Sequence, residues 1–366
     1  MRKILLLVLA FSILSIAPVR AAVTITISEP TYRLSPGIFL DDTLAQEIAP
    51  TGRLGKLLFD PKKIETKWLV DVAVIEEIAD LADGYTYLDS EQKEVSVSTL
   101  ILADIWLNTF RTVTRNAVVL ALPYGNPSSS LVKKIEPSEL DLYSALGQER
   151  LSLYLDRKVG AVVISDPGKI SDTNISLYRE LRSSISIINT VVTLREVEDL
   201  RLRLAQLLHP GLDEIRGASL RKALGDAVVE MNKRIRVSGG NYTITSSSYE
   251  LPITVVNRFD QQINLDLRIS ASNSRVLVGK LGRISVAAQS QLQIKVPLTV
   301  IASGDTVLRV QLWTPAGAEI GSAKKIPLRL AVISTATTWF ATFLTVILLF
   351  AIVVQSLRRV KRRRSR

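Results

Sequence analysis

The stretch WLVDVAV at residues 68–74 is a continuous apolar run interrupted by one acidic residue. Two similar runs follow at residues 117–122 (AVVLAL) and 160–165 (GAVVIS), and residues 184–192 are a weaker fourth candidate. Continuous apolar strands that alternate with helices are typical of a parallel sheet covered on both faces. We therefore expect an α/β domain with a parallel sheet over residues 22–238.

Helical patterns lie before and after the candidate strands. Apolar residues of segment 102–113 fall on one helical face. The sequence Thr193-Leu-Arg-Glu196 matches a capping box, which predicts that a helix opens there. A third apolar stripe runs from Leu220 to Ile235, and the double glycine at 239–240 is expected to end its helix.

The pattern changes after the double glycine. Apolar and polar residues alternate with period two over 263–269, 292–300 and 308–312, with turn signals between them. About seven short strands with one apolar face are typical of an immunoglobulin-like β-sandwich, which we expect over residues 241–332. Pro297 inside one of these strands indicates an edge strand, because proline lacks the N–H that a ladder requires.

The N-terminal 21 residues have the pattern of a secretory signal peptide. Arg2 and Lys3 precede thirteen apolar or small residues at 4–16, and a small-residue cleavage site ends at Ala21. The alternative is an uncleaved anchor, but thirteen residues are short for a membrane span. We expect cleavage and export.

Residues 335–357 have the pattern of a transmembrane helix, because no charged residue occurs from Leu330 to Leu357. A buried core helix is the alternative, but such a helix would show a polar face. The basic tail at 358–366 predicts a cytoplasmic C-terminus, and hence a single-pass cell-membrane protein with its N-terminal bulk outside. We also expect the tail to bind anionic lipid headgroups.

Composition excludes several classes of function. The formal net charge is +11, but the tail carries seven basic residues and the first 20 residues carry three, so the rest of the chain has a net charge of +1. This near-neutral remainder does not favour nucleic acid as a partner. The chain has no cysteine and one histidine, His209, so thiolate chemistry and a two-histidine metal site are excluded. We expect a bacterial protein without metal or cofactor.

Polar residues follow three of the candidate strands: Asp71, then Tyr124 and Asn126, then Asp166. Ligands of α/β sheets collect at the carboxyl ends of strands. Asp71 and Asp166 are the candidate catalytic residues, because glycoside hydrolysis uses a pair of carboxyl groups. Tyr124 and Asn126 are the candidate ligand-binding residues of a glycan crevice. Ordinary turn formation is the third explanation of the same residues.

Four segments carry a family resemblance: 68–85 (WLVDVAVIEEIADLADGY), 121–127 (ALPYGNP), 246–259 (SSSYELPITVVNRF) and 296–321. Together with the basic-tailed final helix, they resemble an uncharacterised family of actinobacterial membrane-anchored envelope proteins, whose genes often neighbour that of the MurJ-type lipid II flippase. The resemblance implies a barrel-like domain similar to glycan hydrolases or deacetylases, then an immunoglobulin-like domain and one span. Members of that family usually have an acid where Asn126 stands.

Three hypotheses for function follow. The first is a non-catalytic cell-envelope protein that binds a glycan or a membrane partner in peptidoglycan or envelope assembly. The second is a carbohydrate-active hydrolase that uses Asp71 and Asp166. The third is a scaffold whose final helix contacts another membrane protein. The missing metal ligands and the amide at position 126 favour the first hypothesis.

Overall fold

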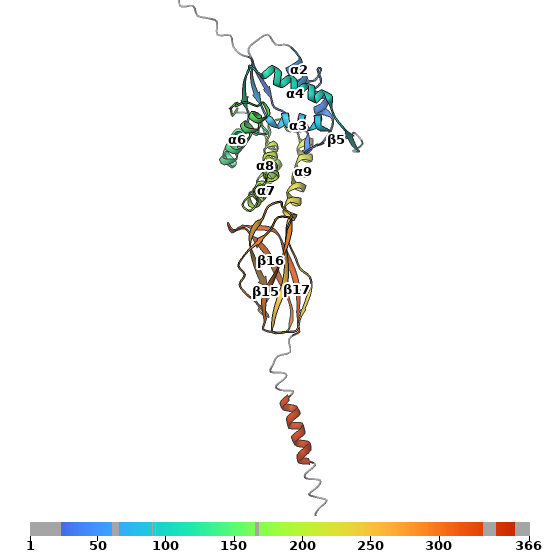
Figure 1. Ribbon diagram of the computed structural model, residues 1–366, viewed down its shortest axis with the longest axis vertical. Helices are drawn as coiled ribbons and strands as arrows, with labels where there is room; N and C mark the ends of the chain where they lie inside the picture. Colours follow the sequence, from blue (N-terminus) through green and yellow to red (C-terminus); the bar gives the residue numbers. More distant parts are fainter. Residues whose placement is uncertain are drawn as a thin grey trace, which may run out of the picture. The chain divides into compact units, whose positions relative to one another are not determined.

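The computed structural model describes residues 23–60, 66–89, 91, 93–164, 168–331 and 342–355 (Figure 1). These residues belong to two compact units. The first unit takes the chain up to Ile170 together with Leu208–Ser219, and the second takes Ser171–Leu207 and the chain from Leu220. The expected signal peptide at 1–21 and the basic tail at 358–366 lie outside the described residues and stay predictions.

The first unit is built on a four-stranded sheet in which every neighbouring pair runs parallel, in the order β1-β4-β7-β8. Its strands are β1 (Val23–Ile27), β4 (Thr66–Val70), β7 (Val118–Ala121) and β8 (Gly160–Ala161). Its helices are α1 (Thr43–Glu47), α2 (Arg53–Phe59), α3 (Val72–Asp83), α4 (Ile101–Thr114), α5 (Ser129–Ile135) and α6 (Pro137–Tyr154). Long connections that contain helices are what parallel strands require.

A second sheet in the same unit makes the fold class mixed. Its order is β2-β3-β5-β6, in which β3 and β5 pair parallel and the two outer pairs are antiparallel. The strands are β2 (Arg33–Ser35), β3 (Ile38–Phe39), β5 (Tyr85–Leu88) and β6 (Glu94–Val97). The fold class expected from the sequence is therefore wrong: the structure is mixed α/β with several antiparallel sheets. The strands of this second sheet are too short to show a clear apolar periodicity, so the sequence pattern does not predict them.

Aromatic side chains form the centre of the first unit. Trp68 on β4 and Trp106 and Phe110 on α4 are each at most 1% exposed. The Trp106 and Phe110 rings stack with centroids 5.7 Å apart, and Trp68 meets Phe110 edge-on at 6.2 Å. The Trp106 indole N–H donates to the Leu54 carbonyl at 3.2 Å, so its polar atom is satisfied inside the core.

The opening stretch 68–74 changes structure at its acidic residue. The strand ends at Val70, and α3 begins at Val72 with Asp71 as its N-cap. Residues 184–192, expected to be a strand, lie largely in helix α7 (Asp172–Asn189). A short apolar run is compatible with either a buried strand or a buried helix. Here the run is part of a longer apolar stripe along α7, which favours the helix.

The second unit opens with three helices, α7, α8 (Arg195–Gln206) and α9 (Glu214–Lys233), of which α9 starts in the first unit. Leu194 is the N-cap of α8 and makes no side-chain cap bond. Thr193 is therefore not the cap that the capping-box pattern predicts. Its N–H and its hydroxyl donate instead to the side-chain oxygen of Gln261. Helix α9 ends at Lys233, and a strand follows from Ile235 to Ser238. The double glycine at 239–240 therefore follows this strand and, contrary to the expectation from the sequence, does not end the helix.

The strands of the second unit form a β-sandwich, visible as two layers around β15, β16 and β17 in Figure 1. The two sheets have the orders β10-β17-β16-β12-β14 and β13-β15-β11-β9. The strands are β9 (Ile235–Ser238), β10 (Tyr242–Ile244), β11 (Ser248–Asn257), β12 (Ile263–Ala271), β13 (Val276–Val278), β14 (Arg283–Val286), β15 (Ser290–Val300), β16 (Gly304–Trp313) and β17 (Glu319–Leu330). Alternate residues of the long strands are buried, as in immunoglobulin-like sandwiches.

Pro297 lies where a neighbouring strand, β13, is short. Strand β15 is an inner strand, so the edge expected at Pro297 is wrong for the strand as a whole. However, β13 pairs only with Leu298–Val300, and the Pro297 carbonyl accepts from the Gly279 N–H on that side. The nitrogen of a strand residue faces the same side as its carbonyl, so Pro297 removes no bond between β15 and β11.

Strand β17 carries a bulge opposite Gln311. Val310 pairs with Lys324 and Leu312 pairs with Ile320, so three residues of β17 face one residue of β16. The buried Gln311 amide nitrogen lies 3.1–3.3 Å from the carbonyl oxygens of Leu312, Ile320 and Gly321. This one side chain therefore supplies the donors that the interrupted ladder lacks.

Gln311→Leu is expected to lower the free energy of unfolding by about 2 kcal/mol, because it leaves buried carbonyl oxygens without a donor. Urea denaturation of both proteins measures the change. Gln293→Leu, on an exposed face of β15, serves as the control and is expected to change stability by less than about 0.5 kcal/mol. Equal stability of the Gln311 variant and the parent would show that the bulge needs no such support.

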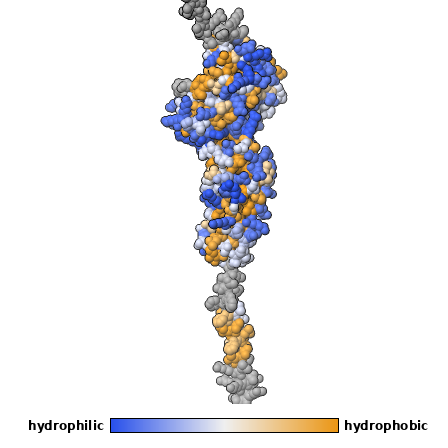
Figure 2. All heavy atoms as spheres, turned by 60° about the vertical axis from the view of Figure 1, so that its left-hand side comes forward, coloured by the Kyte–Doolittle hydropathy of each residue, from blue (hydrophilic) through white to orange (hydrophobic). Residues whose placement is uncertain are grey.

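The expected transmembrane helix over 335–357 is wrong: of the helices that the structure describes, none is both long enough and apolar enough to cross a membrane. The described residues of that segment, 342–355, form a hydrophobic helix (Figure 2). The single-pass cell-membrane localisation that was expected from this segment is therefore wrong as well.

Candidate functional site

Polar residues from three adjacent strands meet at the carboxyl edge of the parallel sheet. Ser28 follows β1, Asp71 follows β4, and Tyr124 to Asn126 follow β7. The sheet order places β4 between β1 and β7, so these three strand ends are neighbours. The structure thus brings together three of the four residues chosen from the sequence: Asp71, Tyr124 and Asn126.

Asp71 is fully buried and joins two segments of backbone. Its Oδ1 accepts from the Ala73 N–H at 3.0 Å, which caps α3, and from the Gly125 N–H at 2.9 Å. Its Oδ2 is buried and has no hydrogen-bond partner among the described residues. Burial raises the pKa of this carboxyl to about 8, although the two backbone N–H bonds oppose the shift.

The turn that meets Asp71 has an unusual backbone. Gly125 and Asn126 have φ angles of 69° and 36°, both in the left-handed region. Glycine enters this region without a steric penalty, and asparagine is among the few other residues that do so readily. The two residues turn the chain so that the Gly125 N–H points at Asp71.

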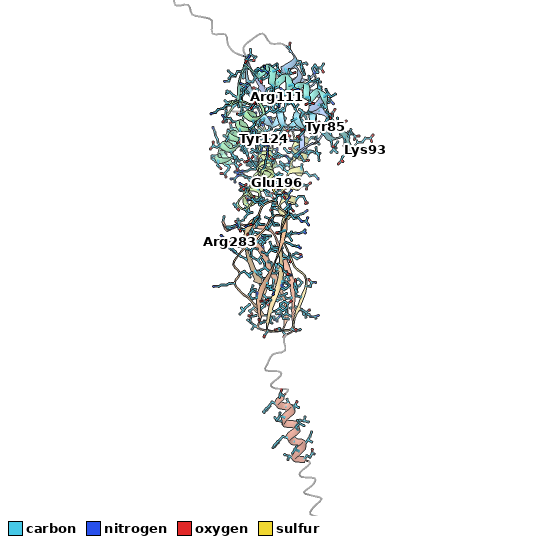
Figure 3. The ribbon with its side chains drawn as sticks, in the orientation of Figure 1. Tyr85, Lys93, Arg111, Tyr124, Glu196 and Arg283 are labelled. Atoms are coloured by element: carbon cyan, nitrogen blue, oxygen red, sulfur yellow. The ribbon has the colours of Figure 1, made fainter. Side chains whose placement is uncertain are left out.

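Tyr124 lies inside the first unit (Figure 3), and its hydroxyl takes part in a charged network. It donates to Glu76 Oε2 at 2.7 Å and accepts from Arg33 Nη2 at 3.1 Å. Burial raises its pKa well above the ordinary value, so the hydroxyl stays protonated and able to donate. Arg150 also contacts Glu76, at 3.1 Å.

Arg33 holds this network together from β2. It is 5% exposed, and its Nη1 donates to Asp80 Oδ2 at 3.0 Å. Burial acts to lower the pKa of Arg33, but the nearby acids outweigh it and raise the pKa above the ordinary value. The guanidinium is therefore charged, and it is paired with side chains of α3 and of the turn after β7.

Asn126 belongs to a second, smaller cluster. Its Nδ2 donates to Ser28 Oγ at 2.8 Å, and the same oxygen lies 3.2 Å from His209 Nε2. His209 Nδ1 lies 3.0 Å from the Gly211 N–H, which can only donate. In the neutral imidazole the proton is therefore on Nε2, which donates to Ser28.

This tautomer argues against a serine nucleophile. A serine is activated when an unprotonated imidazole nitrogen accepts its hydrogen. Here the nitrogen that faces Ser28 carries the proton, and Ser28 Oγ accepts from both Asn126 and His209. The hydroxyl hydrogen of Ser28 is thus directed away from this cluster, where it is available to an acceptor.

The second candidate carboxylate, Asp166, lies outside the described residues, and the pairing of Asp71 with it stays a prediction. Over the ranges that the structure covers, no group of three or more acidic or histidine side chains is arranged to hold a metal ion.

A protein-family model matches residues 183–365, and its description is a family of unknown function (DUF6049). The match covers half of the 366 residues. The chain belongs to this family. The finding is consistent with the uncharacterised family expected from the sequence. No curated protein matches the chain.

Solved structures are similar to this member of the family over about a quarter of its length. A C. elegans MSP family member, WR4, is 12% identical with a TM-score of 0.22, and the match covers 27% of this chain and 98% of that one. The E. coli chaperone DraB is 13% identical with a TM-score of 0.21, and the match covers 27% and 57%. Native E. coli α2-macroglobulin is 15% identical with a TM-score of 0.21, and the match covers 26% of this chain and only 6% of that one.

The residues that sequence reasoning missed are Ser28, Arg33 and Glu76. Ser28 directly follows a five-residue strand, the same position that singled out Asp71 after β4. The β1 pattern VTITI has alternating threonines and no continuous apolar run, so the strand itself was not recognised. Arg33 and Glu76 carry no local signal, because their pairing joins β2 to α3.

Proposed function

We propose that the protein is a non-catalytic binding protein whose ligand is a glycan. The observation that carries the proposal is the enclosure of Asp71. It is 0% exposed, and its Oδ1 is shared by two backbone amides. A carboxyl group in this position stabilises the turn after β7 and the start of α3.

Catalysis by Asp71 is disfavoured on geometric grounds. A raised pKa is a property of a general acid in glycoside hydrolysis, and Asp71 has one. However, a general acid must lie within hydrogen-bond reach of the glycosidic oxygen. A side chain with no exposed surface does not meet this requirement unless the turn at Gly125 opens.

The glycan class is supported by the groups that remain available. The Ser28 hydroxyl is part-buried, and its hydrogen is directed away from Asn126 and His209. A hydroxyl donor of this kind matches the hydroxyl and acetamido oxygens of sugars. The resemblance to actinobacterial envelope proteins makes cell-wall glycan the first ligand to test, ahead of a protein partner.

The test uses the purified full chain and insoluble cell-wall glycan. We expect retention on the glycan and no new reducing ends on long incubation. Ser28→Ala is expected to weaken retention about five-fold, since one hydrogen bond is lost, whereas Asp71→Asn is expected to leave it unchanged.

Two outcomes would contradict the proposal. Time-dependent release of reducing ends that Asp71→Asn abolishes would identify a hydrolase instead. Absence of retention on every glycan tested would remove the binding function. Thermal unfolding of each variant separates loss of binding from loss of folding.

A further inference from the structure

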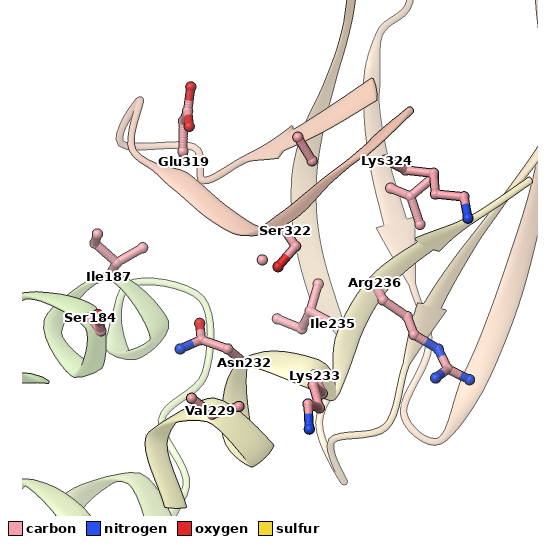
Figure 4. A pocket seen from close by; sticks show the side chains of 13 residues that line it. Ser184, Ile187, Val229, Asn232, Lys233, Ile235, Arg236, Glu319, Ser322 and Lys324 are labelled. Carbon is pink, nitrogen blue, oxygen red and sulfur yellow. The ribbon is translucent and has the colours of Figure 1, made fainter. Parts of the chain in front are cut away.

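Two neighbouring pockets lie in the second unit. The first has a volume of about 620 Å³ and is lined by α7, α9, β9 and β17 (Figure 4). The second has a volume of about 540 Å³. Lys233 and Arg236 line both pockets, so the two pockets are adjacent at the junction of α9 and β9, and we refer to them together as the groove.

The wall of the first pocket is fixed in place. It includes Gly321, Ser322 and Ala323, the bulged residues of β17 that Gln311 supports. Gly321 has a φ angle of 67°, and a Cβ there would lie 2.9 Å from the Ile235 carbonyl oxygen. The bulge therefore packs closely against β9, and Ser322 lies in the middle of the pocket (Figure 4).

The groove has a surplus of cations. Lys233, Arg236 and Lys324 line the first pocket against one acid, Glu319, which lies on the opposite side in Figure 4. In the second pocket, Glu196 pairs with Arg234 at 2.5 Å and Glu230 pairs with Lys233 at 2.5 Å. These two acids are neutralised by cations of the groove itself.

Three cations remain unpaired. Of the residues that the structure covers, none forms an ion pair with Arg236, Arg258 or Lys324, all of which are exposed. The remaining acid of the second pocket, Asp260, accepts from the Gln289 side chain at 2.9 Å. A concave surface with several unpaired cations attracts anions, and arginine binds phosphate and carboxylate with two parallel N–H bonds.

Addition of a peptide strand is a less suitable use of this groove. The neighbouring part of β17 beyond the reach of β10 carries Lys324, Lys325 and Pro327. Lysine and proline on an open strand edge are features that prevent strand pairing. The side chains, rather than the backbone, are therefore what the groove offers to a ligand.

We propose that this groove binds a polyanionic glycan, whose phosphate or carboxylate groups contact Arg236, Arg258 and Lys324. The proposal rests on the glycan-binding function and assigns it a second, charge-selective site. Ser322 and Asn232 add hydroxyl and amide groups for the sugar hydroxyls in the first pocket. Two adjacent pockets allow more than one charged unit of a polymer to be bound.

The experiment measures binding of the full chain to labelled poly(glycerol phosphate) and oligogalacturonate by fluorescence anisotropy, with maltooligosaccharide as the neutral probe. We expect at least one of the two anionic polymers to bind, and the affinity to fall as salt rises. The polymer that binds distinguishes phosphate from carboxylate recognition. The double variant Arg236→Gln/Lys324→Gln is expected to weaken binding about ten-fold.

Arg309→Gln/Lys280→Gln is the matched control, because it removes the same charge from exposed positions of the sandwich that do not line the groove. It is expected to change affinity by less than about two-fold. Ser322→Trp fills the first pocket without changing charge, and we expect it to weaken binding as well.

Three results would overturn the proposal: no binding of either polymer, equal weakening by the double variant and its control, or tighter binding of single-stranded DNA at the same groove. Retention on neutral cell-wall glycan through Ser28 is independent of Arg236 and Lys324. Its survival in the double variant separates failure of this proposal from failure of the proposed function.

Discussion

Arg33→Met is expected to lower the free energy of unfolding by about 3–5 kcal/mol, the range measured when one partner of a buried ion pair is removed. Arg33 donates to Asp80 at 3.0 Å and to the Tyr124 hydroxyl at 3.1 Å, and it lies 3.7 Å from Glu76. Methionine fills most of the same volume, so the loss comes from the unpaired acids rather than from a cavity.

Two controls refine this expectation. Arg33→Lys keeps the charge but not the planar fork that reaches two partners, so we expect an intermediate loss of stability. Arg283→Met removes an exposed arginine whose partner is Asp266 and is expected to have little effect. Guanidinium denaturation measures all three. A loss below about 1 kcal/mol for Arg33→Met would contradict the importance of the network.

Asp71→Asn is expected to remove most of the pH dependence of stability between pH 4 and pH 8. The pKa of Asp71 in the folded protein is about 8, above the ordinary value of 3.8. Between these values the unfolded chain loses the proton and the folded chain keeps it. Wild-type stability therefore falls as pH rises, by about 1.4 kcal/mol per pH unit from this group. Above pH 8 both states are ionised and the slope ends.

Asparagine keeps the Oδ1 acceptor for Ala73 and Gly125 and does not ionise. We therefore expect the variant to equal the wild type, or to be slightly less stable, at pH 4 and to be more stable at pH 8. Asp71→Ala, which loses the cap and the link to Gly125, is expected to be less stable than Asp71→Asn at every pH. Thermal unfolding of the wild type and both variants over this pH range measures these differences in stability. Parallel pH profiles of wild type and Asp71→Asn would show that Asp71 is ionised in the folded protein.

The elements with strong periodicity could be predicted from the sequence. Strand β7, helix α4 and the long strands β12, β15 and β16 follow from apolar spacing alone, because each buries a continuous face. Strands β2 and β3, with three and two residues, carry no such pattern. The run at 184–192 fits a strand as well as the helix that the structure shows, because a short apolar run does not distinguish the two.

Part of the candidate site could also be predicted from apolar spacing. Asp71, Tyr124 and Asn126 stand directly after apolar runs, and parallel topology brings strand ends together. Their chemistry was not predictable, since it depends on burial: the same carboxyl would be an acid in an open cleft and is a helix cap here. The ion pair of Arg33 and Asp80 joins residues that are 47 positions apart, so the sequence around either residue does not predict it.

By itself, the sequence determined which segments are apolar enough to be buried, that cysteine chemistry is absent, and that a β-sandwich follows an α/β region. These properties are carried by side-chain composition and period, which are local. Only the tertiary structure decided that Asp71 is enclosed, that Ser28 Oγ accepts from Asn126 and His209, and that unpaired cations line a groove beside the bulge of β17. Burial, tautomer and charge pairing depend on neighbours that are distant in the chain, so only the folded arrangement fixes them.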